Sequence, residues 1–275
     1  MPWKARSGKE YSLCLLDTNA ISEILKNPNN EGKGFIEKFP PLSFVPCFTI
    51  YNVIELRRIT KLYEKFLDFF SIYPIFIVKP QSMILDQEIV NYGKNSKVSI
   101  LLNAFSKKGD NPSYNIIIFF DKLFNNTQIK KIESSWRYEE HETLNNWLSM
   151  KENFSVSSSY PNLEDAEEYM NEAGLQTLIN LKPDWCGSII KNGSIPNIDN
   201  FPSLKISLYS LYYRLYNPSW IAKPGEVTDI QIISAVPYVD NFITEKFQAN
   251  IITKIKNRVK YLDLLSVKRL KDIRS

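Results

Sequence analysis

The sequence has little histidine, no paired cysteines and no long hydrophobic run. His141 is the single histidine, so chemistry that needs no histidine base fits this chain best. Cys14, Cys47 and Cys186 are scattered, without zinc-knuckle or redox spacing. The first two lie in apolar runs, which indicates buried thiols and a reducing compartment. No run reaches the roughly 18 apolar residues of a membrane span, and the amino-terminal residues lack the apolar core of a signal peptide. We therefore expect a cytoplasmic protein with no membrane partner.

The composition is that of an ordinary globular chain, and its charge is unevenly distributed. Of the 275 residues, 44% are hydrophobic, 13% aromatic and 23% charged, and the formal net charge is +4. The residues after Glu245 hold nine lysines or arginines but only two aspartates, so this segment carries +7. Such a segment could hold a phosphate backbone. The alternative, weighed equally, is a solvated helix face followed by a charged edge strand.

Apolar strand patterns alternate with helical patterns in the first 80 residues. Residues 13–16, 42–50 and 71–80 are typical of short buried strands. A helical pattern follows the first strand, and residues 51–70 carry an apolar face at helical spacing. This alternation predicts an α/β domain with a parallel sheet.

The middle of the chain has a different character. Residues 81–222 are rich in asparagine, serine, lysine and aromatics, and their apolar spacing predicts a helical insertion with no further sheet. The α/β pattern then returns, with a helix over 225–239 and a short strand within 240–247. We therefore divide the chain into the first part of one domain, 1–80, the insertion, 81–222, and the last part of the domain, 223–275.

Three acidic residues lie where the predicted elements meet. Asp17 closes the first strand, in a run that changes abruptly from apolar residues to helix-capping ones. Glu55 falls in the first turns of the helix after the second strand, and Asp229 near the start of a later helix. In open α/β sheets, ligands bind in the crevice at the carboxyl ends of the strands. We expect Asp17, Glu55 and Asp229 to converge there.

Two further acids, Asp240 and Glu245, bracket the last predicted strand and compete for membership of the same cluster. Several acids in one crevice repel each other unless they are protonated or bound to cations. Mg²⁺ or Mn²⁺ suits an all-oxygen site, and two such ions can clamp a phosphodiester during hydrolysis. The alternatives are that Asp240 caps a turn and that Glu226, three residues before Asp229, favours a helix start.

At this point three segments of the chain resemble a known family. LLDTNAISE after an apolar strand resembles the opening motif of PIN-domain ribonucleases, the VapC-like toxins among them. VPCFTIYNVIELRRI resembles the second strand and helix of that family, and TDIQIISAVPYVDNFITEKF resembles its closing segment. The resemblance covers roughly residues 11–80 and 224–260, and the middle of the chain is unmatched.

The resemblance implies a three-layer α/β/α domain with a central parallel sheet and Mg²⁺- or Mn²⁺-dependent cleavage of single-stranded or structured RNA. By position it makes Asp17, Glu55 and Asp229 metal ligands. It sets Thr18 and Asn19 beside the first acid and Thr244 near the site. Its fourth acid is contested here between Asp240 and Glu245. The chain is about twice as long as a compact toxin of this type, which favours an enlarged nuclease in a toxin–antitoxin or defence system. An inhibitory protein partner and a homodimer are compatible with such a role.

An acidic site that acts on RNA also needs nearby cations. Arg57 and Arg58, one helical turn from Glu55, are the candidates for substrate contact, or else are ordinary surface charges. Two other functions stay open. One is a PIN-like module that binds nucleic acid or a partner but cuts weakly or not at all. The other is a phosphoryl-transfer enzyme with Asp17 as nucleophile, which Asn19 disfavours because such sites commonly place an aspartate there.

Overall fold

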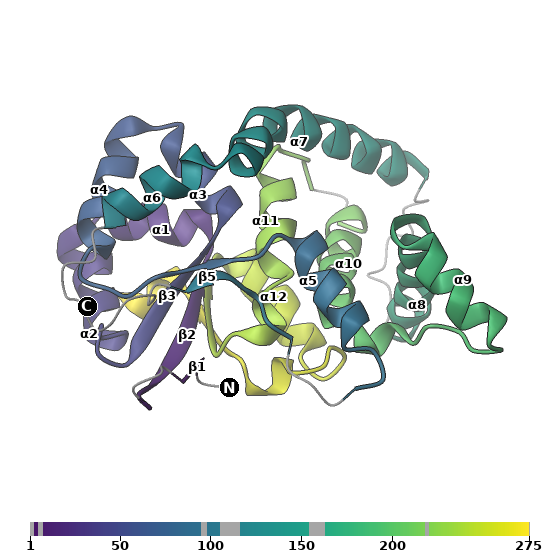
Figure 1. The fold of residues 1–275 in the computed structure, drawn as a ribbon. Coiled ribbons are helices and arrows are strands. Elements are labelled where there is room, and N and C mark those ends of the chain that lie inside the picture. The colour runs from purple at the N-terminus through teal and green to yellow at the C-terminus, as the bar shows by residue number, and fades with distance from the viewer. Residues whose placement is uncertain are drawn as a thin grey trace.

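A single mixed β-sheet runs through the protein (Figure 1). The computed structural model describes residues 3–4, 8–94, 98–104, 116–153, 163–217 and 220–274. The strand order is β5-β4-β3-β2-β6-β7, and β1 pairs with the start of β2. All neighbours along the main path are parallel except β5, which is antiparallel to β4. The strands are β1 (Trp3–Lys4), β2 (Glu10–Leu16), β3 (Phe44–Thr49), β4 (Phe76–Val78), β5 (Leu101–Ala104), β6 (Asn241–Thr244) and β7 (Ser266–Arg269).

Helices cover both faces of this sheet, which gives the predicted three-layer α/β/α architecture. Helices α1 to α4, with α6 and α7, share the core of one face, and α5, α10 and α12 share that of the other. The helices are α1 (Thr18–Lys26), α2 (Lys33–Lys38), α3 (Ile50–Arg57), α4 (Thr60–Phe70), α5 (Gln81–Val90), α6 (Ile116–Asn125), α7 (Thr127–Asn153), α8 (Leu163–Leu181), α9 (Pro183–Lys191), α10 (Pro202–Leu215), α11 (Gly225–Ile233) and α12 (Lys246–Ile255).

The first central strand shows why helices cover both faces of the sheet. Successive side chains of a strand point to opposite faces. In β2, Leu13 and Leu15 belong to one buried cluster, whereas Cys14 and Leu16 belong to the other. Because all four residues are apolar and buried, neither face can be left to solvent. The four-residue run in the sequence therefore specifies a central strand.

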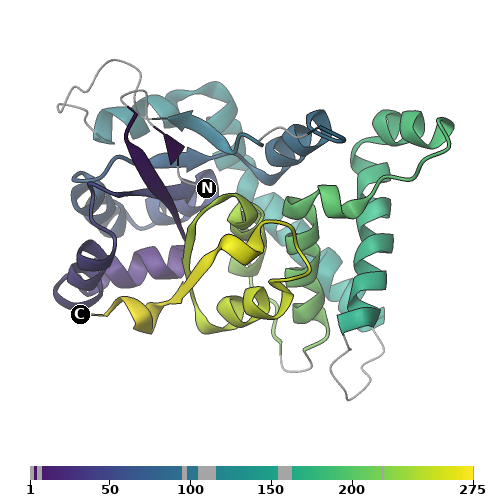
Figure 2. The same cartoon turned by 90° about the horizontal axis from the view of Figure 1, so that it is seen from below.

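The middle segment is mainly helical, as expected, but the prediction that it adds no sheet is wrong. Residues 101–104 form β5, which pairs with β4 at the edge of the sheet. The phenyl ring of Phe120 in α6 lies 5.6 Å from that of Phe66 in α4, and both side chains are fully buried. Almost all of α10 is buried as well. The segment therefore shares the core of the α/β domain; α8 packs on α10 and adds Ala166 and Met170 to the cluster that holds Leu13 and Leu15, and α9 lies farther out, beyond α10 (Figure 2).

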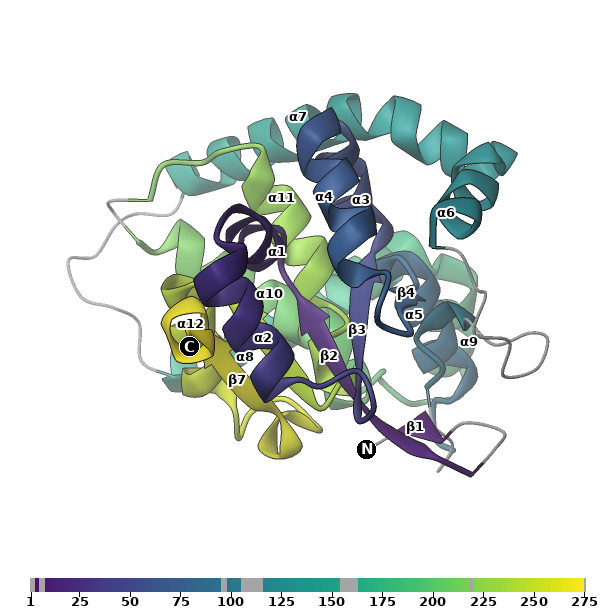
Figure 3. The same ribbon diagram turned by 90° about the vertical axis from the view of Figure 1, so that its left-hand side faces the viewer.

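Two features position the rest of the molecule around the sheet. Helix α7 crosses above the ends of α3 and α11, over the carboxyl ends of the strands (Figure 3). At the edge of the sheet beside β6, β7 carries Lys268 and Arg269. It is the charged edge strand that was one of the two interpretations of the basic last segment.

None of the helices in the described ranges is long and apolar enough to cross a membrane.

The shared core predicts how the protein unfolds. Phe120→Ala should lower the free energy of unfolding by about 3–5 kcal/mol, because it empties a buried ring position between α4 and α6. Ile118→Ala on the exposed side of the same helix is the matched control and should change it by less than about 0.5 kcal/mol. Urea denaturation should show one transition in each protein. A separate transition assigned to the middle segment would contradict the shared core.

Candidate functional site

Asp17 lies where β2 gives way to α1, and every hydrogen bond it accepts comes from a neighbouring element end. It is the N-cap of α1, and its Oδ1 accepts a hydrogen bond from the backbone N of Ala20 at 2.6 Å. Its Oδ2 accepts from the hydroxyl of Thr244 and, at 3.1 Å, from the backbone N of Glu245. Because β2 and β6 are parallel with Leu16 beside Ile243, their next residues meet at one edge. The side chain of Asp17 is consequently only 4% exposed.

Glu55 joins this edge through a short chain of polar side chains. Thr18 donates to the Oε2 of Glu55 at 2.5 Å and accepts from the Nδ2 of Asn52 at 2.9 Å. Asn52 is itself fixed, because it forms the reciprocal capping box of α3 with Thr49. The sequence prediction included Thr18 and Glu55 but missed Asn52. The strand-to-helix transition at Thr49, with a polar residue three positions later, is the signal that could have found it.

Asp229 lies beside a fully buried arginine that the sequence prediction did not include. Arg214 of α10 has no exposed surface, and its Nη2 lies 3.4 Å from the Oδ2 of Asp229. Its Nε donates to Glu226, and its Nη1 donates to both the hydroxyl and the carbonyl of Ser210. Buried charges are normally paired in this way. The available signal was that Arg214 is the only charged residue within 207–217.

The middle segment also contributes a buried acid, Glu140 of α7. Its Oε1 accepts from the hydroxyl of Thr228 at 3.2 Å, and its Oε2 lies 3.8 Å from Nη1 of Arg58. The carboxylate of Glu140 is close enough to Glu55 to raise the pKa of Glu55 by repulsion. No motif marked Glu140, because its role depends on how α7 packs across the site.

Four acids at this edge, Asp17, Glu55, Asp229 and Glu245, hold their protons more tightly than usual. Burial raises the pKa of Asp17 to about 6, against the opposing effect of its hydrogen bonds. Burial likewise raises the pKa of Glu55 and of Glu245. The pKa of Asp229 lies well above its ordinary value because of burial and the negative charges of Asp17, Glu226 and Glu245, partly offset by Arg214. Burial is the main cause of all four shifts, with repulsion among the acids adding to it, so a bound cation would favour the ionised carboxylates.

Two of the predicted site residues lie apart from this cluster, and a third is exposed in the helix turn beside it. Asp240 is at the opposite, amino end of β6, where its Oδ2 accepts from the backbone N of Leu13 at 2.8 Å. The expectation that Asp240 rivals Glu245 is thus corrected, since Glu245 is the one beside Asp17. Arg57 faces the middle segment, with its Nε 2.9 Å from Oε1 of Glu133. Asn19 is exposed on α1.

The oxygen ligands of the cluster suit Mg²⁺ or Mn²⁺, but the positions of its carboxylates do not yet form a metal-binding group. The available ligands are carboxylate and hydroxyl oxygens, which hard divalent cations prefer. Within the described ranges, however, no three acidic, histidine or cysteine side chains form a group set to hold a metal ion. Three hydrogen bonds to Asp17 and the arginine beside Asp229 keep these carboxylates in place. Asp17, Asp229 and Glu245, whose charges act on one another, are the residues that would hold an ion, with Glu55 joined to this group through Thr18.

Compared with known proteins, the chain matches no protein-family model, no curated protein and no solved structure. The chemistry of the cluster is therefore inferred from its own residues.

The raised pKa of Asp17 predicts how stability depends on pH in the absence of metal. The folded protein keeps this proton up to about pH 6, whereas the unfolded chain loses it near pH 3.8. The contribution of Asp17 to the free energy of unfolding is therefore fully present below pH 3.8 and is lost as the pH rises through 6. Over this pH range the free energy of unfolding of Asp17→Asn should fall by about 3 kcal/mol less than that of the wild type. Denaturation at a series of pH values in chelator measures this difference, with Glu23→Gln, a partly exposed acid of α1, as the control. Parallel curves for Asp17→Asn and the wild type would contradict the prediction.

Proposed function

We propose that the protein is a metal-dependent endoribonuclease that hydrolyses RNA phosphodiester bonds at the carboxyl edge of its sheet. The observation that supports this most is the grouping of Asp17, Asp229 and Glu245, whose charges act on one another, with Glu55 joined to the residue after Asp17 through the hydroxyl of Thr18. A structural role alone gives no reason to gather unneutralised acids, since buried charges normally come in opposite pairs. The likeness of the three motifs to PIN-domain ribonucleases supports the same proposal.

In this proposal, Mg²⁺ or Mn²⁺ supplies a polarised phosphate and an activated water. The chain supplies the carboxylates and keeps them oriented. Thr244 and Thr18 each donate a hydroxyl hydrogen bond to an acid of the cluster, which fixes Asp17 and Glu55 respectively. Arg214 lowers the repulsion around Asp229 without leaving the core. Such partners orient metal-binding carboxylates in the way second neighbours do in known metal sites.

The RNA itself would meet cations on two sides of the acids. Arg58 lies beside Glu140, and the favourable charge of Lys223 is felt at Glu245. The basic residues of the last segment, β7 included, add a further positive surface. A role as a toxin or defence effector, held in check by a partner protein, is part of the proposal and rests only on the likeness of the motifs.

The proposal predicts cleavage of pooled cellular RNA in the presence of Mn²⁺ and none in chelator. Asp17→Asn should lower the cleavage rate by at least about 100-fold, since even the loss of an outer partner of a metal ligand costs about 10–100-fold. Circular dichroism should show that this variant is folded. Sequencing of the cleaved ends would identify the RNA.

Two matched variants make this test specific. Asp240→Asn changes an aspartate of the same strand pair at the opposite edge and should cleave at the wild-type rate. Glu23→Gln removes a partly exposed charge from α1 and should also be silent. Cleavage by Asp17→Asn at the wild-type rate would overturn the proposal, as would loss of cleavage in Asp240→Asn while the fold is retained.

A second candidate function is a module that binds RNA without cutting it. It is favoured by the fixed positive charge of Arg214 inside the acidic cluster and by the lack, in the part of the chain that the structure describes, of a three-ligand metal group. Calorimetry distinguishes the two functions. The module predicts no heat of Mn²⁺ binding and RNA binding that weakens with salt, whereas Mn²⁺ binding that Asp17→Asn abolishes would exclude it.

A further inference from the structure

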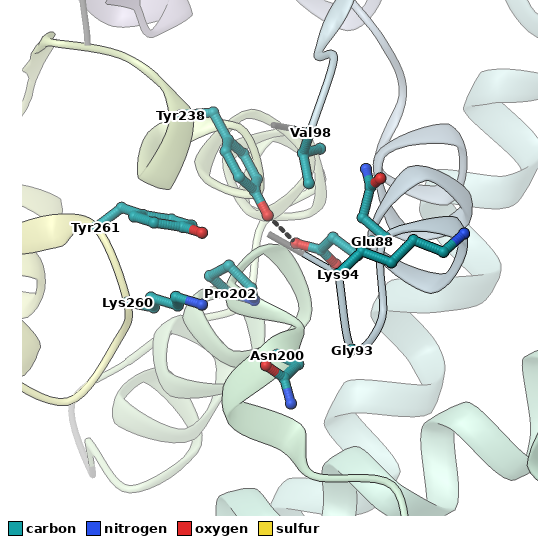
Figure 4. A pocket seen from close by; sticks show the side chains of 10 residues that line it. Glu88, Gly93, Lys94, Val98, Asn200, Pro202, Tyr238, Lys260 and Tyr261 are labelled. Atoms are coloured by element: carbon teal, nitrogen blue, oxygen red, sulfur yellow. Dashed lines mark hydrogen bonds between the residues drawn. The ribbon is translucent and has the colours of Figure 1, made fainter. Parts of the chain in front are cut away.

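A cavity of about 380 Å³ lies at the other end of the sheet from the acidic cluster (Figure 4). Tyr238, which precedes β6, and Tyr261, which precedes β7, line it together with the end of α5 and the start of α10. Its volume is in the range of small-molecule binding sites. Since Arg214 is near the far end of α10, this cavity is separate from the cluster around Asp17.

The floor of the cavity is a built polar group. Glu88 is 2% exposed, and its carboxyl group accepts from the backbone N of Ser203 at 2.8 Å, from the Ser203 hydroxyl at 2.6 Å and from the Tyr238 hydroxyl at 2.5 Å. Burial raises the pKa of Glu88 to about 7, so its negative charge is weakened near neutral pH. Because the Tyr238 hydroxyl donates its hydrogen bond to Glu88, the oxygen of that hydroxyl can still accept a hydrogen bond from an N–H group of a ligand.

One wall of the cavity is an aromatic ring on an unusual backbone. Tyr261 has a φ of 74°, and no other non-glycine among the described residues has a positive φ. This conformation disfavours a bulky side chain, and residues kept in it cluster at ligand sites. The ring of Tyr261 remains 38% exposed although its centroid is only 5.9 Å from that of Tyr238. The ring is partly exposed with the ammonium group of Lys260 over it, so a flat ligand would stack on the ring beside that cation.

The mouth of the cavity carries two cations. Lys94 and Lys260 are exposed and lie on opposite sides of the cavity; in Figure 4 the side chain of Lys260 points into the cavity, whereas that of Lys94 extends away from Tyr261 and would have to turn to meet a ligand. The Nζ of Lys260 lies 5.2 Å from the ring centroid of Tyr261, so one cation and the aromatic wall are adjacent. The amide of Asn200 adds a donor and an acceptor between them. This combination selects an anionic ligand with a planar ring and rejects a purely apolar one.

We propose that the cavity binds a mononucleotide, with its base on Tyr261 and its phosphate between Lys94 and Lys260. An N–H group of the base would reach the hydroxyl oxygen of Tyr238. Lysine ammonium groups bind phosphate as point charges, and aromatic side chains stack on bases with little preference among them. The proposal stands apart from the nuclease function, because none of these residues belongs to the acidic cluster.

Calorimetry of the full chain with each of the four ribonucleoside 5′-monophosphates tests this, with ribose 5-phosphate and inorganic phosphate as the other probes. Tyr261→Gly should weaken mononucleotide binding by about tenfold, because it removes the stacking ring. The variant should fold, since glycine adopts a positive φ freely. The double variant Lys94→Gln, Lys260→Gln should weaken binding by at least about tenfold. Exposed Lys191→Gln is the matched control and should bind like the wild type.

The outcomes separate the cavity from the acidic cluster. Binding that persists in Asp17→Asn supports the cavity, and binding lost in that variant but kept in Tyr261→Gly overturns it. No heat from any mononucleotide at about 1 mM overturns the proposal as well. Equal affinity for ribose 5-phosphate and the mononucleotides would overturn the stacking role of Tyr261.

Discussion

The parallel pairing of β2 with β6 is the contact on which the candidate site depends. It sets Leu16 beside Ile243, and the hydrogen bond from Thr244 to Asp17 then joins residues 227 apart in the sequence. Parallel strands end at the same edge, so the helices that follow them start there too. Asp17, Glu55 and Glu245 lie near this edge because each follows a strand that ends there, and Asp229 comes to it on α11. The side-chain hydrogen bonds refine positions that the sheet has already set.

The buried positive charge of Arg214 partly balances the negative charges of the cluster. Arg214 is fully buried and is held by Ser210, Glu226 and Asp229, so its charge is a permanent part of the core. It offsets part of the repulsion among the acids, yet the pKa of Asp229 stays well above its ordinary value. One fixed cation is therefore too little for this many carboxylates, and the remaining demand is met by protons or by an added cation.

Much of the fold could be predicted from the sequence, because the central strands are short apolar runs followed directly by capping residues. Asp17 and Glu55 could be placed for the same reason, since each follows a strand end. Asp240 was misjudged because its distance from the edge depends on where β6 begins, and that follows from register with Leu13. Arg214 and Glu140 were missed because their partners lie on other helices, and the edge strand β5 was missed because its pairing with β4 is a tertiary contact.

The position of β6 so late in the chain has a consequence for synthesis on the ribosome. Until residues 241–244 emerge, the long central strand β2 pairs only with β3 and, at its start, with the two-residue strand β1, so the edge that β6 later covers is open. At about 5–20 residues per second, this interval lasts roughly 10–45 s. An unpaired apolar strand edge is a template for association with other chains. The nascent chain therefore needs shielding during that interval, and the acidic cluster is assembled only after β6 has emerged.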